Sequence, residues 1–174
     1  ERLLTADTKF LDSLTVTLVY VVVSVPLTLA VALALAVALN TGFRFLGTYR
    51  AIYYLPSLLG GSVAIAVMWR QVFGTDGLLN QVLRLVGIDA TSNWLTNPDT
   101  AIWTLIALHV WQFGSPLVIF LAGLKQIPAD YYEAAALDGA GPLRSFWSIT
   151  LPMLTPVLFF NLVMQTIGAF QAFS

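Results

Sequence analysis

The chain has 174 residues, of which 58% are hydrophobic and 10% are charged, and its mean hydropathy is +0.82. This composition lies outside the range of soluble globular proteins and indicates an integral membrane protein. A net charge of −1 gives no electrostatic footprint for nucleic acid, and the absence of Cys with a single His excludes disulfides, thiolate chemistry and a His-cluster metal site within these residues.

Four apolar stretches have the length of membrane spans. Roughly 20 helical residues cross a hydrocarbon core of about 30 Å. The stretches lie at residues 14–39, 51–69, 101–124 and 149–173. The expected fold is therefore that of an all-α integral membrane protein, a polytopic helical bundle. Because the chain starts without Met and stops inside an apolar run, we expect a fragment that is incomplete at both ends.

The first stretch alternates Ala with larger residues from Ala30 to Leu39, which is the period of a strand. A transmembrane strand needs only about 10 residues and places polar side chains toward a lumen, so the length and composition favour a helix. On a helix, Ala30, Ala34 and Ala38 share one face. Small side chains there would allow a second backbone to approach closely.

The first two connections between the stretches differ in character. Residues 40–50 form a short connection, whereas residues 72–100 are long enough to hold an amphipathic helix at 78–85. Trp94 and Trp103 are expected at the membrane–water interface, where tryptophan is enriched. The second connection is therefore predicted to be interfacial.

The third stretch carries a polar cluster just before Pro116. His109, Gln112 and Ser115 lie there, and polar side chains inside a span usually face a cavity or another helix because they are costly in lipid. Gln112 and Ser115 are candidates for contact with a transported solute. Packing is the favoured role for the lone His109.

Residues 125–148 form a polar, alanine-rich connection that predicts a short helix outside the membrane. Pro128 suits a helix start, and acidic residues in the first turns favour the positive end of the helix dipole. Gly139 is expected to end the helix in the left-handed conformation, and Gly141-Pro142 should prevent it from resuming. A second short helical stretch at 145–148 should lead into the fourth span. A small-residue helix of this kind can enter a cleft on a partner.

The fourth stretch has a narrow polar face. Asn161 and Gln165 are four residues apart and share this face with Gly168 and Ala172. Both polar side chains are candidates for the solute pathway. Hydrogen bonding to a neighbouring helix is the alternative, and the sequence leaves it open.

The basic residues do not decide the orientation of the chain. Of the eight Lys and Arg residues, Arg44, Arg50, Lys125 and Arg144 lie on one side of the predicted spans, and Arg2, Lys9, Arg70 and Arg84 lie on the other. Since the positive-inside rule needs an asymmetry, this equal division leaves the assignment to other arguments.

The connection at 125–148 resembles a known family. Glu133-Ala134-Ala135, Gly139, Ile149 and Leu151-Pro152 match the loop pattern of the permeases of binding-protein-dependent ABC importers. The match extends over most of the chain. Further similarity to the carbohydrate-uptake branch lies at Tyr54-Leu55-Pro56, Asn80, Trp94-Leu95 and the segment from Gly123 to Pro128.

This resemblance implies the MetI-like transmembrane domain of a type I ABC importer in a bacterial or archaeal inner membrane. It places residues 125–148, the coupling loop, in the cytoplasm, in a groove of an ATP-hydrolysing subunit. The implied partners are that subunit, a second permease subunit, an extracytoplasmic solute-binding protein, membrane lipid and a sugar-like substrate. The residues expected to couple to the ATPase are Glu133, Ala134, Ala135, Asp138, Gly139, Ile149, Leu151 and Pro152.

The chain is not expected to be an enzyme or to hold a cofactor. It has no Gly-x-x-x-x-Gly-Lys-Ser/Thr loop to bind ATP phosphates, so ATP is expected on the partner subunit. An ion-coupled secondary carrier is disfavoured because no charged residue lies in the middle of a span. A membrane-embedded hydrolase is disfavoured because His109 and Ser115, six residues apart, would lie on different helix faces. A structural membrane scaffold is the remaining alternative.

Overall fold

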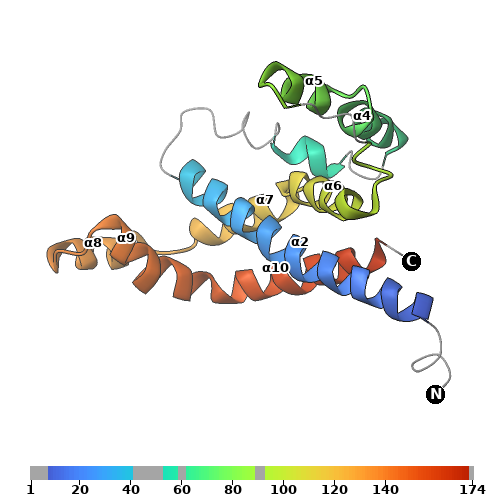
Figure 1. Ribbon diagram of the computed structural model, residues 1–174. Coiled ribbons are helices and arrows are strands. Elements are labelled where there is room, and N and C mark those ends of the chain that lie inside the picture. Colours follow the sequence, from blue (N-terminus) through green and yellow to red (C-terminus); the bar gives the residue numbers. More distant parts are fainter. Residues whose placement is uncertain (1–7, 41–52, 59–61, 89–92, 173–174) are drawn as a thin grey trace.

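A computed structural model describes residues 8–40, 53–58, 62–88 and 93–172, and every regular element in these ranges is a helix. The all-α prediction is therefore confirmed. The elements are α2 (Thr8–Asn40), α4 (Val63–Phe73), α5 (Leu78–Leu85), α6 (Pro98–Trp111), α7 (Gly114–Leu124), α8 (Ala129–Leu137), α9 (Pro142–Ser145), the π-helix η1 (Phe146–Thr150) and α10 (Leu151–Gln171), drawn in Figure 1. Residues 53–58 are also helical.

The long helix α2 is the centre of the bundle and packs against α6, α7 and α10. Its interior Pro26 does not end it, and the Thr28 hydroxyl donates to the carbonyl of Ser24 at 2.8 Å on the turn around this proline. Because a proline frees the carbonyl four residues before it, here that of Val22, this bond does not replace the one that Pro26 removes. The residues of α2 include the predicted span at 14–39.

Small residues of α2 allow the close packing, but on a different face from the predicted one. Ala32 and Ala36 are 0% exposed, whereas Ala30 and Ala34 are exposed. The core around the buried alanines contains Leu117, Phe120 and Leu121 of α7 and Leu154 and Ala169 of α10. Both alanine sets have the same spacing of four, so spacing alone could not tell which face meets α7 and α10.

The predicted third span, 101–124, is a broken helix. α6 ends at Trp111, α7 begins at Gly114, and the two are bent by 41°. Pro116 lies in the first turn of α7, where a residue without an N–H is tolerated, whereas inside one continuous helix it would remove a hydrogen bond. The span at 101–124 thus consists of two helices joined at a break beside Pro116, rather than one continuous helix.

The predicted second span, 51–69, is described only in part. Residues 53–58 are helical and α4 follows from Val63, while 51–52 and 59–61 lie outside the described residues. α4 has 11 residues and rises about 16 Å, so α4 alone does not cover a bilayer core of about 30 Å. The short connection after α2, with Arg44 and Arg50, lies outside the described residues as well.

The described residues contain two helices long and apolar enough to cross a membrane, or three if the bent pair is one span. These are residues 10–40, residues 142–171 and the pair of α6 with α7. The helical run into the last of them starts at Pro142, earlier than the predicted 149. That all four predicted stretches cross the membrane stays a prediction.

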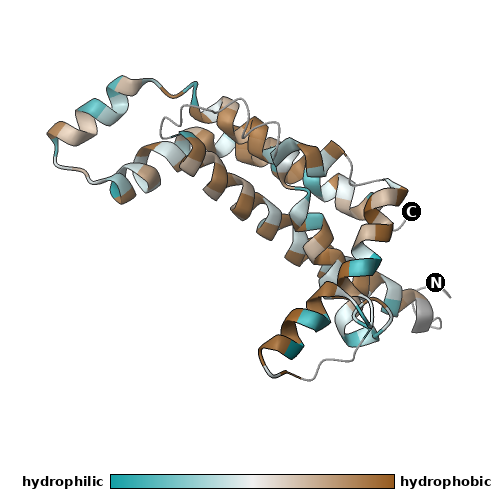
Figure 2. Cartoon of the chain, turned by 90° about the horizontal axis from the view of Figure 1, so that it is seen from above, coloured by the Kyte–Doolittle hydropathy of each residue, from teal (hydrophilic) through white to brown (hydrophobic). Residues whose placement is uncertain are grey.

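The outer surface of the long helices is strongly apolar. Figure 2 shows hydrophobic colouring along both long helices of the bundle. Val22 of α2 is 67% exposed and Phe159 of α10 is 64% exposed. Because lipid tails solvate such side chains as well as a protein core does, this surface suits a lipid environment.

Candidate functional site

Helix α8 projects from the bundle together with α9, at the far left of Figure 1. It follows Pro128 and has Asp130 in its first turn, and four of its nine residues are alanine, the best helix former. No residue of α8, all of which the structure describes, is buried. The candidate coupling element is therefore a short exposed rod outside the packed bundle.

Gly139 ends this rod as the sequence predicts, with φ of +75°. Its N–H donates to the carbonyl of Ala136 at 3.0 Å, and the N–H of Ala140 donates to the carbonyl of Ala135 at 2.9 Å. This pair of bonds is a Schellman motif, which pairs carbonyls at the helix end that would otherwise lack a donor. Asp138 is the C-cap residue and is exposed. α8 thus has a defined end that does not depend on a partner.

The exposed surface of α8 combines small, acidic and large apolar side chains. Glu133 and Ala134 are exposed, and Ala135 is half-buried. Leu137 is 90% exposed and Tyr131 is 52% exposed. Neither Leu137 nor Tyr131 was predicted as a coupling residue, although a leucine at the end of an alanine-rich helix outside the spans was a usable signal. An apolar side chain so exposed outside a span suits burial in a partner surface.

A hydrogen bond connects α8 to the helical run that leads into α10. The hydroxyls of Tyr132 and Thr150 are 2.9 Å apart, and Thr150 is only 6% exposed. Neither residue belongs to the predicted coupling set. Thr150 occupies the undefined position between Ile149 and Leu151 in the loop pattern, so the pattern itself could not reveal it.

The remaining coupling candidates lie at the base of the loop, away from the exposed rod. Ile149 belongs to η1, where the N–H of Leu151 donates to the carbonyl of Phe146, five residues back. Pro152 follows at the start of α10 and has no N–H to donate. π-helical turns often lie at functional sites. Ile149 and Leu151 are half-buried, so their position suits holding the loop rather than docking.

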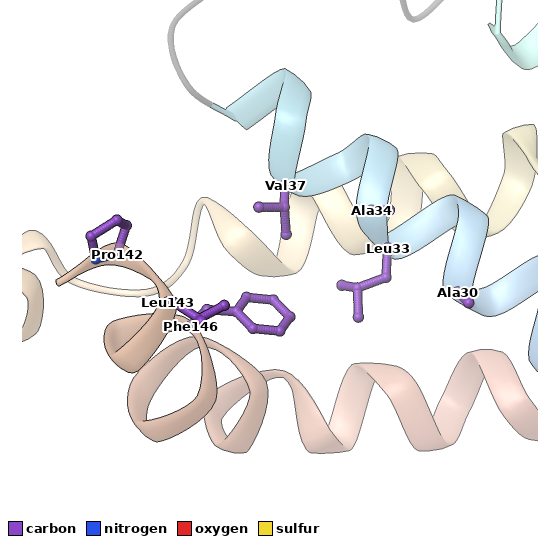
Figure 3. Close-up of a pocket in the computed structure, with 7 residues that line it drawn as sticks. All are labelled: Ala30, Leu33, Ala34, Val37, Pro142, Leu143 and Phe146. Carbon is purple, nitrogen blue, oxygen red and sulfur yellow. The ribbon is translucent and has the colours of Figure 1, made fainter.

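An apolar groove of about 600 Å³ runs between α2 and the base of the loop. Figure 3 shows its lining side chains, which come from α2 and from the start of the last helical run: Ala30, Leu33, Ala34, Val37, Pro142, Leu143 and Phe146. The exposed alanine face of α2 thus lies opposite Phe146 in this groove.

A second cavity, of about 460 Å³ and partly open, lies among α2, α6, α7, α10 and the helical residues 53–58. Three of the four predicted pathway residues line it, namely Gln112, Ser115 and Gln165. Its other lining residues are Tyr20, Ser57, Leu105, Leu108, His109, Met164, Gly168 and Ala172. We call it the polar cavity.

His109 lines the polar cavity, although its predicted role was packing. Its imidazole meets the ring of Tyr20 edge to face, with centroids 5.6 Å apart, and Gln165 lines the same cavity. The buried Nε2 atom has no hydrogen-bond partner among the described residues. His109 and Ser115 reach the same cavity because the helix breaks between them, which corrects the expectation of different faces.

Asn161 does not line the polar cavity. It is 1% exposed, and its side-chain amide donates to the carbonyl of Val157 at 3.1 Å. Asn161 and Gln165 are four residues apart, so their side chains point about 40° apart around the helix axis. That difference puts Asn161 in the packed interior of the bundle and Gln165 in the cavity.

Residues 3–174 match the family described as the binding-protein-dependent transport system inner membrane component. The chain is 55% identical over 174 residues to the probable ABC transporter permease protein YesP of Bacillus subtilis, covering all of this chain and 56% of that protein. It is 37% identical over 138 residues to the trehalose/maltose transport system permease protein MalF of Thermococcus litoralis, covering 78% and 46%.

Two further similarities complete the comparison. The arabinooligosaccharides transport system permease protein AraP of Bacillus subtilis is 34% identical over 133 residues, with 75% of this chain and 42% of that protein covered. The crystal structure of a bacterial ABC transporter involved in the import of alginate matches with a TM-score of 0.78 at 24% identity, covering 93% of this chain and 57% of that chain. The fold is therefore that of an ABC transporter membrane domain. The chain spans about half the length of the curated relatives it matches.

Proposed function

Because this chain belongs to the family of binding-protein-dependent transport system inner membrane components, we propose that it is part of the membrane-spanning permease subunit of an ATP-driven importer of sugars or similar polar solutes. In this role it is a multi-pass component of a bacterial or archaeal inner membrane. The ATPase site belongs to a separate subunit, and this chain transmits motion without catalysing a reaction.

The observation that carries the proposal is the geometry of α8. It is an exposed rod with a fixed end, and the bond from Tyr132 to Thr150 links it to the helical run that continues into α10. α10 brings Gln165 to the polar cavity. Movement of α8 by a nucleotide-driven partner would therefore shift the cavity wall through one packed helix. Glu133, Ala134 and Leu137 form the surface offered to that partner.

The polar cavity suits an uncharged, hydroxyl-rich solute. Gln112, Ser115 and Gln165 offer amide and hydroxyl groups that both donate and accept hydrogen bonds, and His109 has an unused nitrogen. No Asp, Glu, Lys or Arg lines this cavity in the described part of the chain. The relatives named for arabinooligosaccharides and for trehalose/maltose support a carbohydrate as the cargo.

The importer requires partners beyond this chain. A second permease subunit would complete the pathway, and cytoplasmic ATP-binding subunits would hold α8. An extracytoplasmic solute-binding protein would deliver the cargo, and the crystal structure of the alginate transporter in complex with an alginate-bound periplasmic protein supports this arrangement.

Crosslinking tests the coupling role in the intact, membrane-reconstituted importer. Leu137→Cys should crosslink to the ATPase subunit, because its side chain is exposed on α8. Leu85→Cys is a matched control, since Leu85 is 86% exposed but lies on α5, far from α8. Equal crosslinking at both positions, or none at Leu137, would overturn the coupling role. Uptake that continues without ATP and collapses with a protonophore would instead favour an ion-coupled carrier.

Uptake kinetics test the cavity. Gln165→Ala should raise the KM for the sugar several-fold, because one amide is lost from the cavity wall, with a smaller change in kcat. Asn161→Ala is the contrasting variant and should lower thermal stability without changing the KM, because Asn161 is packed away from the cavity. A KM that responds to Asn161 and not to Gln165 would show that the pathway lies elsewhere.

A further inference from the structure

Helix α5 is a short amphipathic helix set apart from the bundle, beyond α4, in both Figure 1 and Figure 2. Its bounds, Leu78–Leu85, are those predicted from the sequence. With eight residues it rises about 12 Å and cannot cross a membrane. It lies outside the predicted spans, so an apolar surface on it is not explained by a lipid-crossing role.

A buried asparagine holds α5 in place. Asn80 is 0% exposed, and its amide donates to the carbonyls of Thr75 at 2.8 Å and Gly74 at 3.3 Å. Its Oδ1 accepts the indole N–H of Trp94 at 2.7 Å. The inward side of this helix is therefore polar at its centre, and the orientation of α5 is fixed by three directed hydrogen bonds.

The outward side of α5 has two flanks of opposite character. Leu78, Val82, Leu85 and Val86 are 59%, 55%, 86% and 72% exposed, and at 3.6 residues per turn they fall within an arc of about 100°. We call these four residues the apolar flank. They have the exposure that a docking surface needs, and the described residues leave them uncovered.

The other flank is polar. Gln81 and Arg84 are exposed there, and Gln81 lines a groove that contains Arg70, Gln71, Asp76 and also Leu78 of the apolar flank. The boundary between the apolar and polar flanks therefore runs along the helix axis. An apolar flank with an arginine beside it suits a helix that lies at a lipid–water boundary.

We propose that α5 lies in the membrane–water interface, with the apolar flank inserted among lipid acyl chains and Arg84 at the level of the lipid phosphates. A guanidinium beside a phosphate forms charge-assisted hydrogen bonds, which complements the insertion of the apolar flank. Trp103 of α6, near the start of that helix, is 58% exposed, and exposed tryptophan is enriched at the same depth.

This anchoring reaches two helices of the bundle through Asn80. Gly74 is the C-cap of α4, and Trp94 precedes α6, whose residue Thr100 donates from its hydroxyl to the Trp94 carbonyl at 3.0 Å. A membrane-bound α5 therefore holds the end of α4 and the start of α6 at one depth in the bilayer. The inference depends on the membrane location of the chain and not on its cargo or on its ATPase.

Site-specific lipid quenching tests the proposal in the intact permease, assembled with its partner subunits in lipid nanodiscs. The 174 residues contain no Cys, so Val82→Cys, Leu85→Cys and Arg84→Cys each give this segment one thiol for an environment-sensitive fluorophore, in an assembly whose other cysteines have been replaced. We expect spin-labelled lipids to quench the label at 82 and 85 several-fold more than at 84, and iodide in the buffer to show the reverse order.

Two outcomes would overturn the proposal. Iodide quenching of equal strength on both flanks would mean that α5 is surrounded by water. Protection of positions 82 and 85 from both lipid and iodide quenching would mean that a protein partner covers the apolar flank. Repeating the measurement with and without the solute-binding protein would show whether that protein is the partner. Photolabelling of the unmodified protein with a lipid-soluble carbene reagent is the second measurement, and it should mark the peptide containing Leu85 and Val86.

Discussion

Helices α5 and α8 are two short elements that each expose a leucine almost completely, yet their surroundings differ. Leu85 of α5 is 86% exposed and Leu137 of α8 is 90% exposed. α5 separates apolar from polar side chains along its axis and is fixed by a buried asparagine. α8 mixes alanine, leucine and carboxylates and is held through its end and one tyrosine. The exposure of a leucine therefore does not show by itself whether lipid or protein covers it. The arrangement of polar groups around the leucine has to be considered as well.

The largest expected effect comes from the end of α8. Gly139→Val places a β-branched side chain at a φ of +75°, which costs roughly 1–2 kcal/mol and disrupts the Schellman motif. ATP-driven uptake by the reconstituted importer should be abolished while membrane insertion is unchanged. Gly141→Val is the matched control, because its φ is −73° and a Cβ there meets nothing within 4 Å in the described residues. Equal loss in both variants would show that the conformation of Gly139 is not the cause.

The corresponding change in α5 removes its buried asparagine. Asn80→Leu leaves the Trp94 indole N–H and the Thr75 carbonyl without their partner, at a cost of about 2 kcal/mol. The melting temperature of the purified permease should fall, and crosslinking of α8 to the ATPase should be retained. Gln81→Leu, which removes an exposed hydrogen bond to the Asp76 carbonyl, should change stability by less than about 0.5 kcal/mol. A similar fall in melting temperature in both variants would show that Asn80 does not anchor α5.

The smallest expected effect concerns the bond between α8 and η1. Tyr132→Phe removes one hydroxyl and should cost about 1 kcal/mol of stability. The sugar transported per ATP hydrolysed should decrease, because α8 keeps its surface but loses part of its connection to the helix behind it. A double-mutant cycle with Thr150→Val provides the check, since the two changes should not be additive if the hydroxyls interact. Full additivity would contradict the proposed connection.

Much of the local structure followed from the sequence. The bounds of α5 are as predicted, and the left-handed Gly139 was foreseen because few other residues adopt that conformation. The coupling loop pattern led to the family. An interruption of the third stretch at Pro116 was foreseen but its form was not, because Pro116 is compatible with a kink, a first turn or a bend, and only the packing around α7 selects one of these.

The polar side chains show the same limit. On sequence grounds, Gln165 and Asn161 were equally good candidates for the solute pathway. Nothing in the sequence pointed to a contact between Tyr132 and Thr150. Which side chain meets a cavity depends on a rotation of about 40° around a helix axis. Such a rotation is set by the neighbouring helices and leaves no trace in residue spacing.

The sequence by itself determined that this is an apolar helical protein with a capped, exposed helix between its last two apolar stretches, since hydropathy, proline and glycine act over a few residues. Only the tertiary structure decided which face of α2 is buried, that His109 and Ser115 meet in one cavity, and that α5 turns its asparagine inward. These depend on contacts between segments distant in the chain, where several arrangements satisfy the same local preferences and close packing selects one.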